Sequence, residues 1–386
     1  MHVKLSYFRK YVNAYYNSAF GTPLTDCCST CLRTKEQLKI ATSLDVRQKL
    51  LTEHRVHIAK AKAFFGLLKT KLNTSYFSFD CQKNLALPRL PNQAAYFSQQ
   101  INYNNFTVVA GTSRDKLTPR NVFSYLWTEI DSRKDSNTIA SALNHTLKSF
   151  DFDPSIETVR LFADGCGGQN KNTNMMAMLA YWLLEESPKH IRQIELIFPI
   201  VGHSFIPPDR VFGLIEKDIK KISVIVEVSG YDDLIRKHST IRKIGIDWDL
   251  FDWRTQTKRA IKLPSSWHFE FNKAKRFIFY KKEKNVLIQG EPNYCTDVGK
   301  ASSVCKKNFS LSSMAPKKLT LGKGLRGGIK ALLTTFFPNT TEKIGEVFLN
   351  YTFTKSSSKK VMPHQKKTLM RTVAKMSRMI PFFCEH

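Results

Sequence analysis

The chain has 386 residues, of which 42% are hydrophobic and 12% aromatic, and this composition excludes a wholly disordered or fibrous protein. Its 60 Lys and Arg exceed its 32 Asp and Glu, and the net charge of +28 favours a polyanionic partner, nucleic acid before an acidic membrane. Residues 251–386 hold 27 basic and 8 acidic groups, so +19 of the excess lies in the last third. We therefore expect a basic carboxy-terminal region that contacts phosphates, or else a solvated basic tail.

The amino-terminal third is expected to be helical. Residues 1–20 are aromatic-rich and predict a helix, which the Gly and Pro residues of 21–23 interrupt. From 34 to 72 apolar residues recur at helical spacing among charged ones, which predicts one or two long amphipathic helices. We assign residues 1–73 to this helical region.

At Ser75 the sequence changes from charged residues with helical periodicity to alternating aromatic residues, which predicts the start of a sheet. Alternating or aromatic segments indicate three strands, and helices and strands then alternate, which is typical of an α/β sheet with crossover helices. The expected strands are 75–80, 94–109, 121–128, 158–163 and 194–201, and the expected helices are 135–150, 172–186 and 207–221. We place this α/β domain, a mixed sheet flanked by helices, at 74–240. A basic region at 241–386, α+β or partly disordered, follows it.

Three strands followed by alternating helices and strands are the order of the ribonuclease H-like fold. That fold carries acids on its first strand, at its fourth strand and on its last helix, and this chain has acids at each place: Asp80, Asp164, and Asp209 or Glu216. Acids at the carboxyl ends of neighbouring parallel strands meet at one edge. Convergent carboxylates suit two Mg²⁺ or Mn²⁺ ions. The alternative is that each acid is a turn or helix-capping residue.

The segment Asp164–Asn172, Asp-Gly-Cys-Gly-Gly-Gln-Asn-Lys-Asn, predicts a contact with nucleic-acid phosphates. Glycines let backbone N–H groups approach a phosphate at a helix amino terminus. The spacing is not that of a P-loop, and a tight turn is the alternative. The expected contacts are Gly167, Gly168, Gln169, Asn170 and Lys171.

His203 lies six residues before Asp209 and is predicted to orient an acid or the attacking water. A histidine before the last acid is also a feature of 3′–5′ exonucleases. Those enzymes need a second acid two residues after the first, where this chain has Gln82, which disfavours that function. A hydrogen-bonded turn histidine is the structural alternative.

Cysteine and histidine spacing near the amino terminus predicts structural zinc. Cys28 and Cys31 form a C-x2-C pair, and His54 and His57 follow in a predicted helix. Because the H-x2-H spacing is shorter than usual, one alternative is that a single histidine ligates. Another is that Cys27 replaces Cys28, and a third is that the cysteines are reduced core residues.

Four strings of residues resemble an uncharacterised, transposon-derived protein family with a ribonuclease H-like, transposase-type domain. They are Phe79–Pro88, Tyr125–Glu129, Asp164–Asn172 and the Gly-His-Ser-Phe-Ile-Pro-Pro-Asp segment of 202–216. The similarity covers residues 5–235 and includes the C-x2-C pair. It implies a transposase-like fold, without implying that this copy cleaves DNA. Family members carry further sequence before the position of Met1, which is the argument for an inactive copy.

Taken together, these patterns predict a transposase-like, metal-dependent nuclease or strand transferase that acts on DNA and has the capacity to oligomerise. A domesticated, non-catalytic nucleic-acid-binding or scaffold protein is the first alternative, and a 3′–5′ exonuclease the second. No signal peptide or membrane span is visible, and the eight cysteines are irregularly spaced. We therefore expect a nuclear or cytosolic protein that is not secreted, with the basic runs favouring the nucleus.

Overall fold

The computed structural model describes residues 4–16, 27–69, 72–91, 100–294, 299–307, 311, 314 and 316–320. The chain divides into two compact units. The first, which we call the helical unit, contains the residues up to Ala61 and the segment Ile200–Ser204. The second, which we call the sheet unit, contains Lys62–Pro199 and the residues from Phe205 onward. The helical unit therefore takes one short segment from the middle of the chain.

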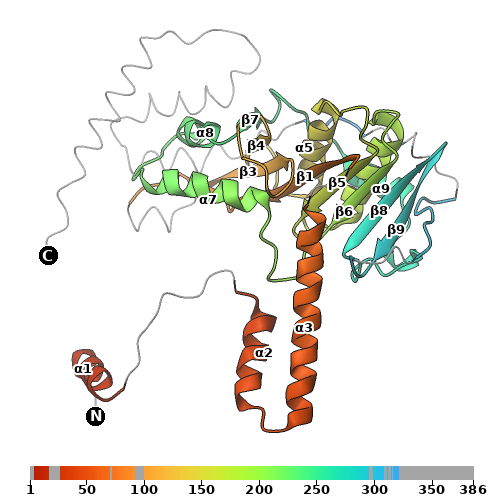
Figure 1. Cartoon of the computed structure of the whole chain (residues 1–386). Helices are drawn as coiled ribbons and strands as arrows, with labels where there is room; N and C mark the ends of the chain where they lie inside the picture. The colour runs from red at the N-terminus through yellow and green to blue at the C-terminus, as the bar shows by residue number, and fades with distance from the viewer. Residues whose placement is uncertain are drawn as a thin grey trace, which may run out of the picture. The chain divides into compact units, whose positions relative to one another are not determined.

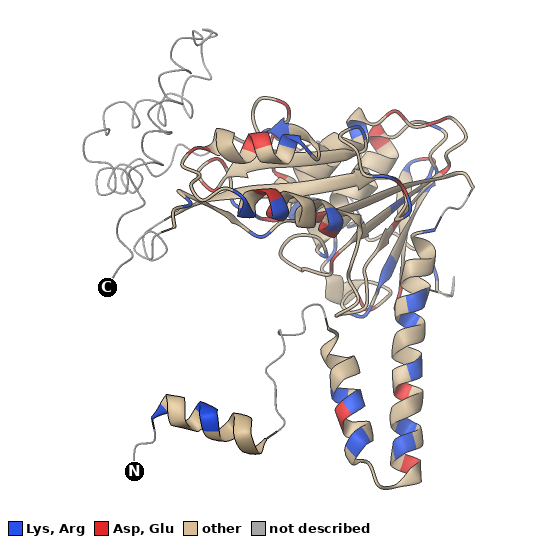
Figure 2. Cartoon of the chain, turned by 60° about the vertical axis from the view of Figure 1, so that its left-hand side comes forward, with Lys and Arg blue, Asp and Glu red and all other residues tan. Residues whose placement is uncertain are grey.

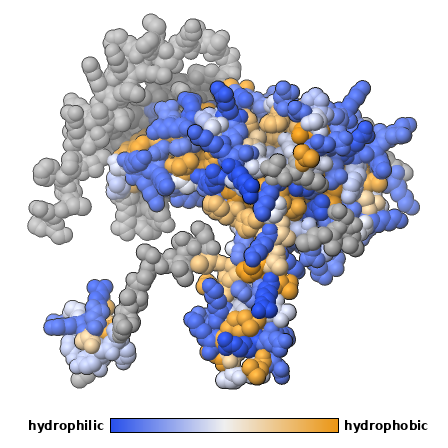
Figure 3. Space-filling view, in the orientation of Figure 1, coloured by the Kyte–Doolittle hydropathy of each residue, from blue (hydrophilic) through white to orange (hydrophobic). Residues whose placement is uncertain are grey.

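The helical unit is built on three helices, α1 (Leu5–Tyr15), α2 (Ser29–Ile40) and the first part of α3 (Leu44–Leu67). Figures 1 and 2 show α2 and α3 as the arms of a helical hairpin. Ile40, the last residue of α2, and Leu44, the first of α3, are exposed. Hydrophobic surface is visible on this hairpin in Figure 3. The long amphipathic segment predicted from residue 34 is thus two helices.

The sheet unit is centred on a nine-stranded mixed sheet, in the order β7-β4-β3-β1-β5-β6-β8-β9, with β2 paired to β3 (Figure 1). Strands β1, β5 and β6 are parallel, β3 runs antiparallel to both β1 and β4, and the β6-β8-β9 edge is antiparallel. The strands are β1 (Thr74–Cys81), β2 (Leu85–Leu87), β3 (Ile101–Ala110), β4 (Val122–Thr128), β5 (Thr158–Ala163), β6 (Gln193–Ile197), β7 (Thr240–Lys243), β8 (Arg276–Lys282) and β9 (Asn285–Glu291).

Helices cover both faces of this sheet. Side chains alternate across a strand, so in β4 Tyr125 and Trp127 join one core cluster and Val122 and Leu126 join the other. The first cluster is closed by α5 (Ser136–Ser149), α6 (Thr173–Tyr181), the π-helical turn Trp182–Glu186 and α9 (Trp253–Ala260). The second is closed by α7 (Pro207–Lys220) and α8 (Val228–Arg236). Within the described residues the sheet unit also contains a single 3-10 turn, Pro264–Ser266.

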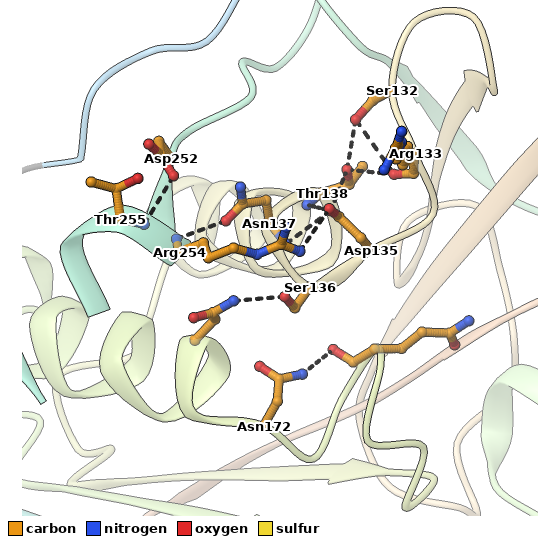
Figure 4. A network of polar contacts seen from close by, with 12 residues as sticks. Ser132, Arg133, Asp135, Ser136, Asn137, Thr138, Asn172, Asp252, Arg254 and Thr255 are labelled. Carbon is orange, nitrogen blue, oxygen red and sulfur yellow. Dashed lines mark hydrogen bonds and ion pairs between the residues drawn. The ribbon is translucent and has the colours of Figure 1, made fainter. Parts of the chain in front are cut away.

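Polar contacts tie together the amino-terminal ends of α5, α6 and α9 (Figure 4). The Asp135 carboxylate accepts hydrogen bonds from two backbone N–H groups of α5 and pairs with Arg254 of α9 at 3.0 Å. The Ser136 hydroxyl accepts a hydrogen bond of 2.7 Å from Asn174 of α6. Three helices distant in sequence thus share one hydrogen-bonded junction.

The expected α/β class, a mixed sheet flanked by helices, is confirmed. Strand β2 was not among the expected strands, and β7, β8 and β9 extend the sheet from residue 240 onward. The division into domains at residues 73 and 240 stays a prediction, and residues 321–386 of the basic region lie outside the described part. None of the helices in the described ranges is both long enough and apolar enough to cross a bilayer.

Candidate functional site

Two of the predicted acids lie beside each other on neighbouring strands of the sheet. Strands β1 and β5 are parallel, and Phe79 is opposite Ala163. The residue that follows each of them in sequence is an acid, Asp80 after Phe79 and Asp164 after Ala163. Phe79 and Ala163 belong to the core cluster closed by α5 and α6. By alternation the two acids point to the opposite face, which α7 covers.

Asp80 shows the electrostatic signature of crowded carboxylates. Burial first, and then the negative charges of Asp164 and Asp209, raise the pKa of Asp80 to about 7. A hydrogen bond from the Cys81 N–H and the charge of Lys134 act in the opposite direction. Asp164 and Asp209 therefore lie close enough to Asp80 to repel its charge, and Asp80 is partly protonated at neutral pH.

The loop after β5 is held by its own side chains. Asp164 accepts hydrogen bonds from the Cys166 N–H and the buried Asn170 amide. The Lys171 ammonium donates to the Asn272 and Ala274 carbonyls at 2.8 and 2.7 Å, and burial lowers its pKa to about 8. Among the predicted phosphate contacts, Asn170 and Lys171 are thus engaged within the protein.

The other predicted phosphate contacts in this loop are more accessible. Gly167 and Gly168 are exposed, and Gln169 is partly exposed. Asn172 ends the loop as the N-cap of α6, accepting from the Met175 N–H at 3.0 Å. The backbone at Gly167 and Gly168 is therefore accessible to a ligand, as is that of Gly165, although the Gly167 carbonyl accepts a hydrogen bond from the Asn172 amide at 3.1 Å.

The two candidates for the third acid differ in their surroundings. The Asp209 carboxylate accepts a hydrogen bond of 2.8 Å from the Ile206 N–H and so caps α7. Glu216, two turns further along α7, accepts from the Gln82 amide at 3.1 Å and pairs with Lys83 at 3.0 Å. Asp209 is the one whose charge acts on Asp80.

A second cluster lies within the helical unit and contains Cys28, Cys31, His57 and His203. Their ligand atoms all lie within 4.8 Å of one another. The Cys28 Sγ is 3.2 Å from the His57 Nε2, the Cys31 Sγ is 3.5 Å from the His203 Nε2, and the two Nε2 atoms are 3.1 Å apart. In the described part of the chain, this is the one group of three or more Cys, His, Asp or Glu that meets this distance.

Local structure presents each of these side chains. Cys28 is the N-cap of α2, so Cys31 falls in the first helical turn, where a C-x2-C spacing directs both thiols to the same side. His57 is on α3, and His203 follows the turn at Gly202. Gly202 has a φ of +81°, and a Cβ there would lie 2.8 Å from the Cys28 Cα.

The side chains of the cluster do not titrate alike. For the Cys28 thiol, burial raises the pKa, but hydrogen bonds from the Cys31 and Thr30 backbone outweigh this and lower it. Burial raises the Cys31 pKa, as does the neighbouring Cys28 thiol. Burial also lowers the pKa of His57, which keeps its imidazole neutral. A neutral imidazole and a thiolate are the forms that bind metals.

The cluster differs in one member from the zinc site predicted from spacing. Cys28, Cys31 and His57 are brought together as predicted, whereas His54 is not in the cluster. His203, predicted as a catalytic residue, occupies the fourth position. His57 and His203 are 146 residues apart in sequence, so local spacing could not predict that they meet. The sequence offered only a glycine and a histidine in a predicted loop.

Residues 108–291 match a family model described as "Domain of unknown function (DUF7869)". No curated protein matches the chain. The match begins in β3, ends with β9, and includes Asp164, Asp209 and Glu216. The similarity to that family therefore covers most of the sheet, including the strands beyond residue 240, in one continuous segment.

Proposed function

We propose that the sheet unit is a ribonuclease H-like domain that acts as a transposase-like, metal-dependent nuclease or strand transferase on DNA. The strand order β4-β3-β1-β5-β6, with β1, β5 and β6 parallel and β3 antiparallel, is the arrangement expected for that fold. The observation that carries the proposal is the adjacency of Asp80 and Asp164, with the charge of Asp209 acting on Asp80.

The chemistry follows from the repulsion among these carboxylates. Three acids near one another are costly when all are ionised, and divalent cations with oxygen ligands offset that cost. Two Mg²⁺ or Mn²⁺ ions at such a site supply an activated water and stabilise the leaving oxygen of a phosphodiester. Asp80 and Asp164 would hold the ions, and the exposed Gly167–Gly168 backbone would approach a phosphate.

Asp209 is the better candidate for the third acid. Glu216 is neutralised by Lys83 and hydrogen-bonded by Gln82, while the charge of Asp209 already acts on Asp80. His203 has no part in this proposal because its imidazole lies with the cysteines. The exonuclease alternative is weakened further, since Gln82 holds Glu216 and accepts a hydrogen bond from Asn105.

A cleavage assay tests the proposal. The full chain is incubated with supercoiled or linear duplex DNA and Mg²⁺ or Mn²⁺, and compared with Asp164→Asn and Asp209→Asn. Loss of a direct metal ligand should reduce cleavage by more than the ~10–100-fold that outer-shell changes cost. The control is Asp233→Asn on α8, whose side chain is 75% exposed, and it should cleave like wild type. Equal cleavage by Asp164→Asn and wild type would show that the proposed site is not catalytic.

Non-catalytic DNA binding is the second candidate, and the net charge of +28 favours it. Helix α3, which begins in the helical unit, carries five basic and two acidic residues, coloured blue and red in Figure 2.

DNA affinity of the full chain should fall steeply as the salt concentration rises, and replacing Lys359 and Lys360 by Gln should make this dependence less steep. Full-chain variants are needed because deletion from residue 251 would remove β8 and β9 from the sheet. Salt-dependent binding with no cleavage under any metal condition would favour this candidate.

A further inference from the structure

We infer that Cys28, Cys31, His57 and His203 form a tetrahedral zinc site, in which the fourth ligand comes from the segment between β6 and α7 rather than from His54. All four residues belong to the helical unit. The inference is independent of the nuclease proposal, because it uses none of the carboxylates of the sheet unit.

The spacing of the ligand atoms is close to that of a zinc tetrahedron. Zn–S bonds of about 2.3 Å and Zn–N bonds of about 2.0–2.1 Å give tetrahedral edges of roughly 3.3–3.8 Å. The observed S···N separations of 3.2 and 3.5 Å and the N···N separation of 3.1 Å are at or slightly below that range. The remaining separations are within 4.8 Å, so side-chain adjustments would bring all four atoms to bonding distance of a single ion.

The donor set selects the kind of ion. Two thiol sulfurs and two imidazole nitrogens match the Cys₂His₂ composition of structural zinc sites and do not suit Mg²⁺ or Ca²⁺, which take oxygen ligands. The two Nε2 atoms face each other at 3.1 Å, where their lone pairs repel unless a proton or a cation lies between them. With four protein ligands the site is closed, which is typical of structural rather than catalytic zinc.

The segment around His203 is shaped to reach the cysteines. The Cys28 Sγ lies 3.6 Å from the Val201 carbonyl oxygen, and the positive φ of Gly202 brings its backbone against Cys28. Any side chain at residue 202 would collide with the Cα, Cβ and Sγ of Cys28. The close approach leaves His203 beside Cys31, where the fourth ligand is needed.

Cobalt is the probe, because tetrahedral Co²⁺ with thiolate ligands gives visible and charge-transfer absorption that Zn²⁺ lacks. The metal-free full chain is titrated with Co²⁺ and then with Zn²⁺. We expect one tetrahedral Co²⁺ per chain, displaced by Zn²⁺. Cys31→Ser and His203→Ala should lose this spectrum or weaken binding at least ~10-fold, and Gly202→Ala should weaken binding. His54→Ala, three residues from His57 on the same helix, is the matched control and should bind like wild type.

A ligand exchange keeps the test decisive if His203→Ala does not fold. His203→Cys supplies a third thiolate, so its sulfur-to-cobalt charge-transfer band should be stronger than that of wild type. An unchanged cobalt spectrum in His203→Ala or His203→Cys, or loss of binding in His54→Ala alone, would overturn the assignment of His203. Absence of tetrahedral Co²⁺ in wild type would overturn the site itself. Asp164→Asn should retain the full cobalt spectrum, which separates this result from the nuclease assay.

Discussion

At the scale of single residues, Asp80 links the electrostatics of the carboxylates to stability. Its pKa in the folded protein, about 7, is above the ordinary value, so folding favours the protonated form. The cost of ionising Asp80 thus begins above pH ~4 and is complete above pH ~7. Three pKa units correspond to ~4 kcal/mol, an upper bound here because Asp80 is only partly buried.

Asp80→Asn should therefore stabilise the protein more at pH 8 than at pH 5, where only part of the cost of ionising Asp80 is present. Urea unfolding without added Mg²⁺ or Mn²⁺ measures the difference at the two pH values. Asp233→Asn is the control and should show no such dependence. If Asp80→Asn changes stability equally at both pH values, Asp80 is not the crowded acid described above.

Side chains that bind distant partners were the hardest to predict from sequence. The C-x2-C pair and His57 were found by spacing because their positions depend on two neighbouring helices. The fourth member, His203, depends on a loop fixed by Gly202. Lys171 was predicted to contact phosphate because it lies in a glycine-rich loop before a helix, but its ammonium binds two carbonyls about a hundred residues away in sequence.

At the scale of elements, helix capping gives a graded prediction. Asp135 caps α5 through the Asn137 and Thr138 N–H groups and pairs with Arg254. Asp135→Asn keeps a capping oxygen but loses the charge, whereas Asp135→Ala loses both. Asp135→Ala should cost ~1–2 kcal/mol and Asp135→Asn less, measured as shifts of the urea midpoint. Equal loss in both variants would show that the ion pair with Arg254, rather than the cap, stabilises this junction.

Elements with a local pattern were predicted well, and those defined by pairing were not. The helix predicted at 135–150 is Ser136–Ser149, and the strand predicted at 158–163 is Thr158–Ala163. Alternation, apolar periodicity and an N-cap acid are local signals. Strand β8, Arg276–Lys282, carries strand-favouring aromatic and β-branched residues between basic ends, and its place in the sheet depends on pairing with β6 and β9.

At the scale of the whole sheet unit, buried charges connect the strands from β5 to β9. Arg160 of β5 donates two hydrogen bonds to Glu195 of β6, which also pairs with Arg276 of β8 at 3.4 Å. Arg276 pairs in turn with Glu291 of β9 at 3.3 Å. These charges are almost completely buried. The class of fold was predictable from element order, but this network depends on pairs between neighbouring strands, the widest of which, Glu195–Arg276, joins residues 81 positions apart in sequence.

Removing Glu195 should therefore weaken the sheet as a unit. Glu195→Gln removes the negative charge that pairs with the buried guanidinium groups of Arg160 and Arg276. This should lower the free energy of unfolding, measured with urea at pH 7, by ~3–5 kcal/mol. Burial raises the pKa of Glu195, but Arg160 and Arg276 outweigh this and lower it. The stabilisation is therefore present above the ordinary glutamate pKa of ~4.3 and is lost as pH falls through the lowered value. The difference in the free energy of unfolding between variant and wild type should shrink in that acid range.

The control is Glu270→Gln, which breaks an exposed pair with Lys273 and should cost no more than ~1 kcal/mol. Similar losses in the two variants would mean that the buried network does not hold β5, β6, β8 and β9 together.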